Sequence, residues 1–125
     1  MALPDPARAA DPGEPMSAQE FESYTTGHTL YYGFAGKEYG AEQYLPGRKV
    51  RWSVLDGKCR EGFWYEAGAM ICFKYLDTPT PQCWTFYKIP GGIRARYENE
   101  PRANDLYETR KSDEPLLCLG PEVGV

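Results

Sequence analysis

The feature that most constrains the fold is a set of four cysteines in a chain of 125 residues: Cys59, Cys72, Cys83 and Cys118. An even number of cysteines in a chain of this size is typical of a small secreted domain held by disulfides. Four cysteines allow three pairings. Two of them lie in segments that alternate as β-strands do, residues 69–75 and 82–89, and a proline-containing loop joins these segments.

The two segments fit together in one antiparallel register. With Cys72 opposite Cys83, Ile71 faces Trp84, and alternation places these apolar side chains on one face and both cysteines on the other. One register thus satisfies both the apolar face and a disulfide. We therefore predict two bridges, Cys72–Cys83 and, by elimination, Cys59–Cys118.

A zinc site is the alternative use of four cysteines. Structural zinc sites usually contain at least two ligands close together in sequence. Here the cysteines are widely spaced, no C-x-x-C occurs, and His28 is the single histidine. We therefore expect disulfides, no metal site and no cofactor.

The N-terminal part divides at about residue 16. Residues 1–15 are rich in Pro, Ala and Asp, and Ala7-Arg8-Ala9 has the A-x-A form of a signal-peptidase site. They are expected to be either a disordered tail or the remnant of a signal peptide. Residues 16–125 are expected to form a single disulfide-bonded β domain.

A short helix is predicted at the start of this domain. Ser17 and Glu20 have the spacing of a capping box, and Met16 and Phe21 occupy the flanking hydrophobic positions. Glycine is common just after the end of a helix, and Gly27 is well placed for that position, so the helix should reach about residue 24 or 25. A helix this short needs Phe21 to pack against the rest of the domain.

The remaining pattern predicts strands separated by tight turns. They cover residues 28–34, 38–45, 49–55, 58–66, 69–75, 82–89 and 93–98. Asp56-Gly57 is a strong two-residue turn signal. Residues between Pro101 and Leu106 are expected to form a loop or one helical turn, and residues 115–119 an edge strand or strap.

The middle strands are apolar on both faces. The registers place Trp64, Ile71, Trp84, Phe86 and Tyr97 on one face, and Val50, Trp52, Phe63, Tyr65 and Met70 on the other. A flat sheet with one wet face does not need this pattern. The predicted fold is mainly β: an antiparallel meander forming a curled sheet or small barrel, with one short N-terminal helix.

A resemblance supports export. The segments Gly62-Phe-Trp64, Ile71-Cys-Phe-Lys-Tyr75 and Cys83-Trp84 resemble a family of small secreted proteobacterial β proteins with a G-x-W, C, C-W pattern. The resemblance covers residues 28–98 and implies an export signal and a disulfide-bonded β fold, with no catalytic residues to carry over. Lipocalin-like barrels also use a G-x-W, but near the first strand, whereas here it lies mid-chain.

Charge and motifs exclude several classes of function. The net charge of -4 disfavours nucleic-acid binding, which needs a basic face. No apolar run approaches the ~20 residues of a membrane span. His28 follows the predicted helix and is given a structural role, and Asp56, Glu61 and Glu66 are interpreted as solvated charges at strand ends. We therefore expect the protein not to be an enzyme.

The aromatic residues of the first strands are the best candidates for binding. Exposed tyrosines offer a large contact area with a polar tip, and the alternative is that these side chains cover the sheet and one end of the core. The candidates are Tyr31, Tyr32, Tyr39 and Tyr44.

Two functions are carried forward. The first is a non-enzymatic, secreted or periplasmic protein-interaction module of the bacterial envelope, with another envelope protein as partner. The alternative is a small β-barrel that binds an apolar or aromatic small molecule. That alternative requires unfilled interior volume, and Trp64, Trp84 and Phe86 are expected to fill the interior.

Overall fold

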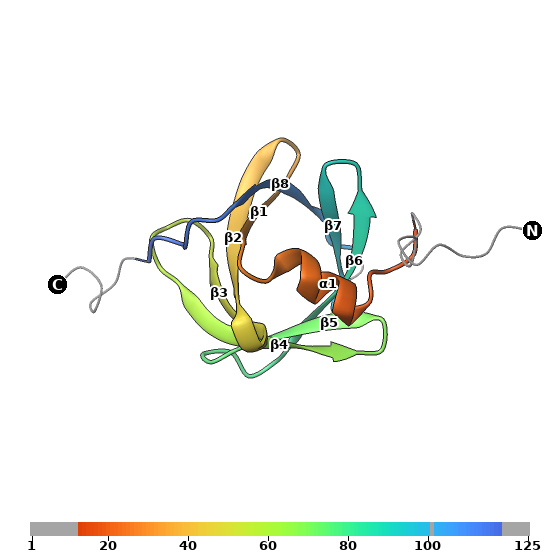
Figure 1. Cartoon of the computed structure of the whole chain (residues 1–125), viewed down its shortest axis with the longest axis horizontal. Helices are drawn as coiled ribbons and strands as arrows, with labels where there is room; N and C mark the ends of the chain where they lie inside the picture. Colours follow the sequence, from red (N-terminus) through yellow and green to blue (C-terminus); the bar gives the residue numbers. More distant parts are fainter. Residues whose placement is uncertain (1–12, 101, 119–125) are drawn as a thin grey trace, which may run out of the picture.

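The computed structural model describes residues 13–100 and 102–118, in which eight antiparallel strands close into a barrel in the order β1 to β8. Figure 1 shows the strands around a central space in which α1 is seen. The elements are α1 (Ala18–Thr25), β1 (Thr29–Phe34), β2 (Lys37–Leu45), η2 (Pro46–Arg48), β3 (Lys49–Ser53), β4 (Arg60–Ala67), β5 (Met70–Tyr75), β6 (Gln82–Ile89), β7 (Gly92–Tyr97) and β8 (Leu106–Ser112). The predicted mainly β class with one short helix is confirmed.

The predicted helix is present with its capping box. The Glu20 amide donates to the Ser17 hydroxyl at 3.1 Å, and the Ser17 amide donates to the Glu20 carboxylate at 2.8 Å. Gly27, at a φ of +89°, follows the helix end, where a residue with a Cβ would be strained. The predicted disordered tail or signal-peptide remnant falls mostly outside the described residues.

Helix α1 covers one end of the barrel. The Phe21 side chain is fully buried, and its ring packs against four rings of the strands at centroid distances of 4.4–6.3 Å: Tyr44, Trp64, Phe73 and Phe86. The turn between β4 and β5 lies at this end too. We call it the closed end, and the opposite one the mouth.

Both predicted disulfides are formed. Cys72 lies opposite Cys83, with Ile71 opposite Trp84, as the pattern predicted. The second bridge joins Cys59 to Cys118, with 5.4 Å between their Cα atoms. With all four cysteines oxidised in pairs, the zinc alternative is ruled out for them. The bridges point to an oxidising compartment outside the cytoplasm.

The face predicted for β3 is wrong. A two-residue turn at Asp56-Gly57 placed Val50 and Trp52 on the same face as Phe63. Instead, β3 ends at Ser53 and β4 begins at Arg60, and the longer loop sets Val50 opposite Gly62. A change of one residue in register exchanges the two faces of a strand. Val50 and Trp52 therefore point into the barrel.

Strand β8 was missed from sequence. It pairs with β1 on one side and β7 on the other, and so closes the ring. Of its residues only Leu106 is buried, and the remainder are polar or partly exposed. That leaves no apolar alternation to detect. Of the predicted tail element, residues 115–118 are not a strand, and Leu116 is held by a hydrogen bond from its amide to the Gln43 side chain at 3.2 Å.

Within the described part of the chain, no helix has the length and apolar character needed to cross a membrane.

Candidate functional site

A cavity of about 410 Å³ opens at the mouth of the barrel. Its size falls within the range of small-molecule pockets, roughly 300–1,000 Å³. Of the eighteen described residues that line it, ten are aromatic. Six of these form the wall: Tyr32, Tyr44, Trp52, Phe73, Tyr75 and Phe86. Four more line the cavity as well, and Phe34 and Tyr39 among them are exposed: Phe34, Tyr39, Trp84 and Tyr97.

Two glycines make room for large rings in this wall. A Cβ at position 40 would lie 2.5 Å from the indole of Trp52. A Cβ at position 62 would lie 2.9 Å from the ring of Tyr75, its partner across the sheet. Each glycine therefore lets an aromatic ring lie close against the neighbouring strand. The rings line the wall instead of filling the centre.

Glu42, on β2, is the polar centre of the cavity. Its side chain points inward between its cross-strand neighbours Leu30 and Trp52, and the residue is only 4% exposed. The Tyr75 hydroxyl lies 3.0 Å and 2.9 Å from the two carboxyl oxygens and donates to the carboxylate. Burial of the carboxyl group raises the pKa of Glu42 to about 8, although the Tyr75 hydrogen bond and the positive Arg60 act in the opposite direction. At neutral pH this group is mostly protonated.

A pair of tyrosine hydroxyls lies deeper in the wall. Tyr32 and Tyr44 are both buried, and their hydroxyl oxygens are 2.9 Å apart. Burial raises the pKa of both phenols well above the ordinary value, so both stay neutral in physiological conditions.

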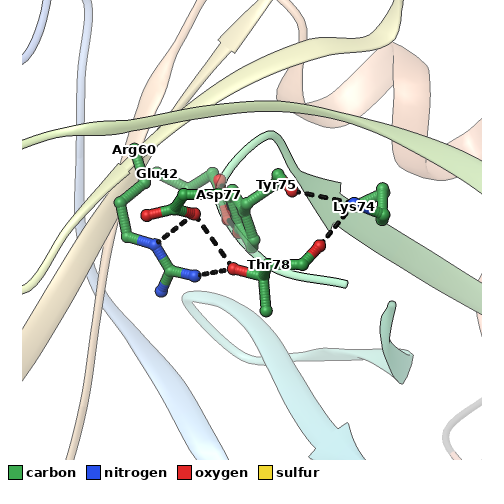
Figure 2. Close-up of polar contacts among 6 residues, drawn as sticks. All are labelled: Glu42, Arg60, Lys74, Tyr75, Asp77 and Thr78. Atoms are coloured by element: carbon green, nitrogen blue, oxygen red, sulfur yellow. Dashed lines mark hydrogen bonds and ion pairs between the residues drawn. The ribbon is translucent and has the colours of Figure 1, made fainter. Parts of the chain in front are cut away.

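A charged cluster holds the loop between β5 and β6 at the mouth (Figure 2). Arg60 donates from Nε to the Asp77 carboxylate at 3.2 Å and from Nη2 to the Thr78 hydroxyl, and its guanidinium lies 4.9 Å from the centre of the Tyr75 ring. Lys74 donates to the backbone carbonyls of Tyr75 and Thr78. The pKa of Asp77 is lowered, mainly by the hydrogen bond from Thr78 and to a smaller extent by Arg60. Arg60 is thereby engaged with the loop.

The structure separates the four candidate tyrosines. Tyr32 and Tyr44 lie in the cavity wall, and Tyr39 stands at the mouth, 48% exposed. Tyr31 faces the outside of the barrel, where the Arg110 guanidinium lies 3.5 Å from its ring centre. The four therefore do not share one exposed surface, and their role in binding stays a prediction.

The sequence predicted that Trp64, Trp84 and Phe86 fill the interior of the barrel, and the structure changes this in part. Trp84 and Phe86 line the cavity without filling it. Trp64 packs lower down, between Phe21 and the Arg48 guanidinium, which lies 4.3 Å from the indole ring. The volume that the ligand-binding alternative requires is therefore present.

The residues weighed for acid–base chemistry lie outside the cavity lining. The His28 imidazole pairs with the Asp113 carboxylate at 2.7 Å, and Glu61 pairs with Arg51 at 2.5 Å. Asp56 and Glu66 are exposed.

Sequence reasoning missed Glu42 and Arg60. The signal for Glu42 was present, because alternation places residues 40, 42 and 44 of one strand on the same face, and Tyr44 is aromatic. A carboxyl group between a glycine and a tyrosine on one face indicates a polar position inside the barrel.

Comparison of the chain with protein-family models, with curated proteins and with solved structures finds no match. The resemblances to secreted proteobacterial β proteins and to lipocalin-like barrels therefore stay predictions, and the function has to be inferred from the cavity.

Proposed function

We propose that this protein is a non-enzymatic barrel that binds an apolar or aromatic small molecule in its cavity. The observation that carries the proposal is the cavity of about 410 Å³, walled mainly by aromatic side chains and open at the mouth. A concave apolar site with a few polar groups is the usual form of a small-molecule site.

The scaffold suits such a role because it is already shaped before binding. The barrel is closed, and the Cys72–Cys83 bridge lies across the strand pair that carries Phe73, Tyr75 and Trp84. A site that needs little ordering loses less free energy on association. Rings that stand apart leave space that an apolar ligand fills by displacing water.

The place of action is part of the proposal. The disulfides indicate an oxidising compartment. We place the protein in the periplasm or outside a bacterial cell, where the small secreted β proteins that it resembles are found.

A second candidate is the protein-interaction module of the envelope. Exposed apolar side chains on the strand ends and loops favour it, because such groups mark contact surfaces. They are Phe34, Tyr39, Val54, Leu55 and Leu76. Three of them also line the cavity, so the same side chains would meet a ligand on its way in.

A fluorescence titration tests the first proposal. N-phenylnaphthylamine, an apolar probe that brightens in dry sites, should bind the native protein and accept energy from Trp52 and Trp84. Ala95 is buried and lines the cavity on β7, so Ala95→Phe should weaken binding at least about tenfold by occupying the space. Ala69→Phe, on the exposed turn before β5, is the matched control. Equal binding to both variants, or no binding to the native protein, would refute the proposal.

A further inference from the structure

Glu42 is the one acidic side chain among the described residues that line the cavity. Its hydrogen-bond partner is the neutral hydroxyl of Tyr75. No cationic side chain in the described residues hydrogen-bonds or ion-pairs with it. A carboxyl group in this position is disfavoured in its charged form by burial, and a cation brought next to it would remove that penalty.

None of the described groups that face Glu42 forms an ion pair with it. Tyr75 on β5 bonds to it, and Tyr32 on β1 and Tyr44 on β2 are neutral phenols close enough to sense its charge. From β3 it meets the indole of Trp52 as its cross-strand neighbour. Arg60, on β4, is the nearby positive group, and its bonds go to Asp77 and Thr78 at the mouth.

We propose that the ligand of this cavity carries an amine on an apolar or aromatic body, and that its ammonium group pairs with the Glu42 carboxylate. The inference rests on the proposed function and names the chemical class of its ligand. The Tyr75 hydroxyl donates to the same carboxylate and so stabilises the charged form that the ammonium requires.

The surrounding rings favour a cation as well. The faces of tryptophan and tyrosine attract a positive charge, most strongly where water is excluded. Trp52 and Tyr75 both adjoin Glu42, so an ammonium group at the carboxylate would lie against aromatic rings. A carboxylate ligand would instead be repelled by Glu42 in its charged form.

Three probes that share a naphthalene ring test this inference: naphthylethylamine, naphthylethanol and naphthylacetate. Their affinities for the full, oxidised chain are measured by calorimetry between about pH 6 and about pH 8. The amine should bind at least about tenfold more tightly than the alcohol at the upper pH, as expected for a paired charge in a desolvated site. The affinity for the amine should rise by up to roughly tenfold for each pH unit, because binding requires Glu42 to lose its proton. The affinity for the alcohol should not change with pH.

Variants assign the effect to one residue. Glu42→Gln keeps the shape and an acceptor for Tyr75, and it should abolish the preference for the amine, so that the amine and the alcohol bind with similar affinity. Glu66→Gln, at an exposed position on β4, makes the same chemical change outside the cavity and should leave all three affinities unchanged. The comparison of probes on the native protein does not depend on either variant.

The outcomes separate this inference from the function beneath it. If the alcohol or the acetate binds as tightly as the amine, or the preference survives in Glu42→Gln, the inference is overturned and the binding function stands. If none of the three probes binds, the binding function is refuted and the inference with it.

Discussion

Replacing Glu42 by Gln should stabilise the barrel in neutral and alkaline solution and change little in acid. In the folded protein, burial raises the pKa of Glu42 from 4.5 to about 8. In the unfolded chain the carboxyl group is in water and ionises near its ordinary pKa. Between these two values the folded state holds a proton that the unfolded state has released, so the free energy of unfolding falls as pH rises. The contribution is favourable below about pH 4.5 and is lost progressively up to about pH 8.

The size of this effect follows from the same two values. A pKa difference of one between the folded and unfolded states corresponds to about 1.36 kcal/mol. A pKa raised from 4.5 to about 8 therefore lowers the free energy of unfolding by an amount on the order of 3 to 5 kcal/mol across that pH range. A domain of this kind has a total stability of about 5–15 kcal/mol, so the loss is a large fraction of it. Glutamine fills the same space without charge, and Glu42→Gln should not show the loss.

Urea denaturation followed by tryptophan fluorescence measures this difference. Native protein, Glu42→Gln and the surface control Glu66→Gln are unfolded at about pH 4.5, about pH 6 and about pH 8 with the disulfides intact. Glu42→Gln should match the native protein in acid and exceed it by several kcal/mol at the highest pH. Parallel pH profiles for the native protein and Glu42→Gln would refute the reasoning, because Glu42 would then ionise alike in both states.

Three further variants test other parts of the structure. Tyr75→Phe removes the hydroxyl that lowers the Glu42 pKa, so that pKa should rise above about 8 in a carbon-13 NMR titration; a fall would contradict the assignment. Gly62→Ala places a Cβ 2.4 Å from the Lys74 carbonyl oxygen and should cost at least about 1–3 kcal/mol in urea unfolding, and an unchanged midpoint would show that the strands are not this close. Phe21→Ala removes the buried ring at the closed end and should cost about 3–5 kcal/mol in the same assay; a loss below about 1 kcal/mol would mean that α1 does not hold that end.

Local chemistry made much of the fold predictable. The reciprocal bonds of Ser17 and Glu20, and a glycine at 27, are signals contained in a few neighbouring residues. The pairing of Cys72 with Cys83 followed because the bridge and the apolar face required the same register. In these places one short segment determines its own structure.

The features that the sequence did not predict all depend on residues far away in the chain. Strand β8 has almost no apolar pattern, and it is a strand because β1 and β7 offer it backbone partners. The register of β3 is set by a loop whose length the Asp56-Gly57 signal did not reveal. Glu42 is buried because strands from distant parts of the chain close around it. Ring closure is a property of the whole chain, and the cavity follows from it.

The pairing of β8 with β1 has a consequence for how this molecule meets others. Each described strand has a neighbour on both sides, although β7 and β8 pair through only two residues of each strand. An open sheet can recruit a foreign strand at its margin and grow into fibrils. In the described barrel no strand lacks a neighbour along its whole length, and the short pairing of β7 with β8 is the place where a foreign strand would find free backbone groups.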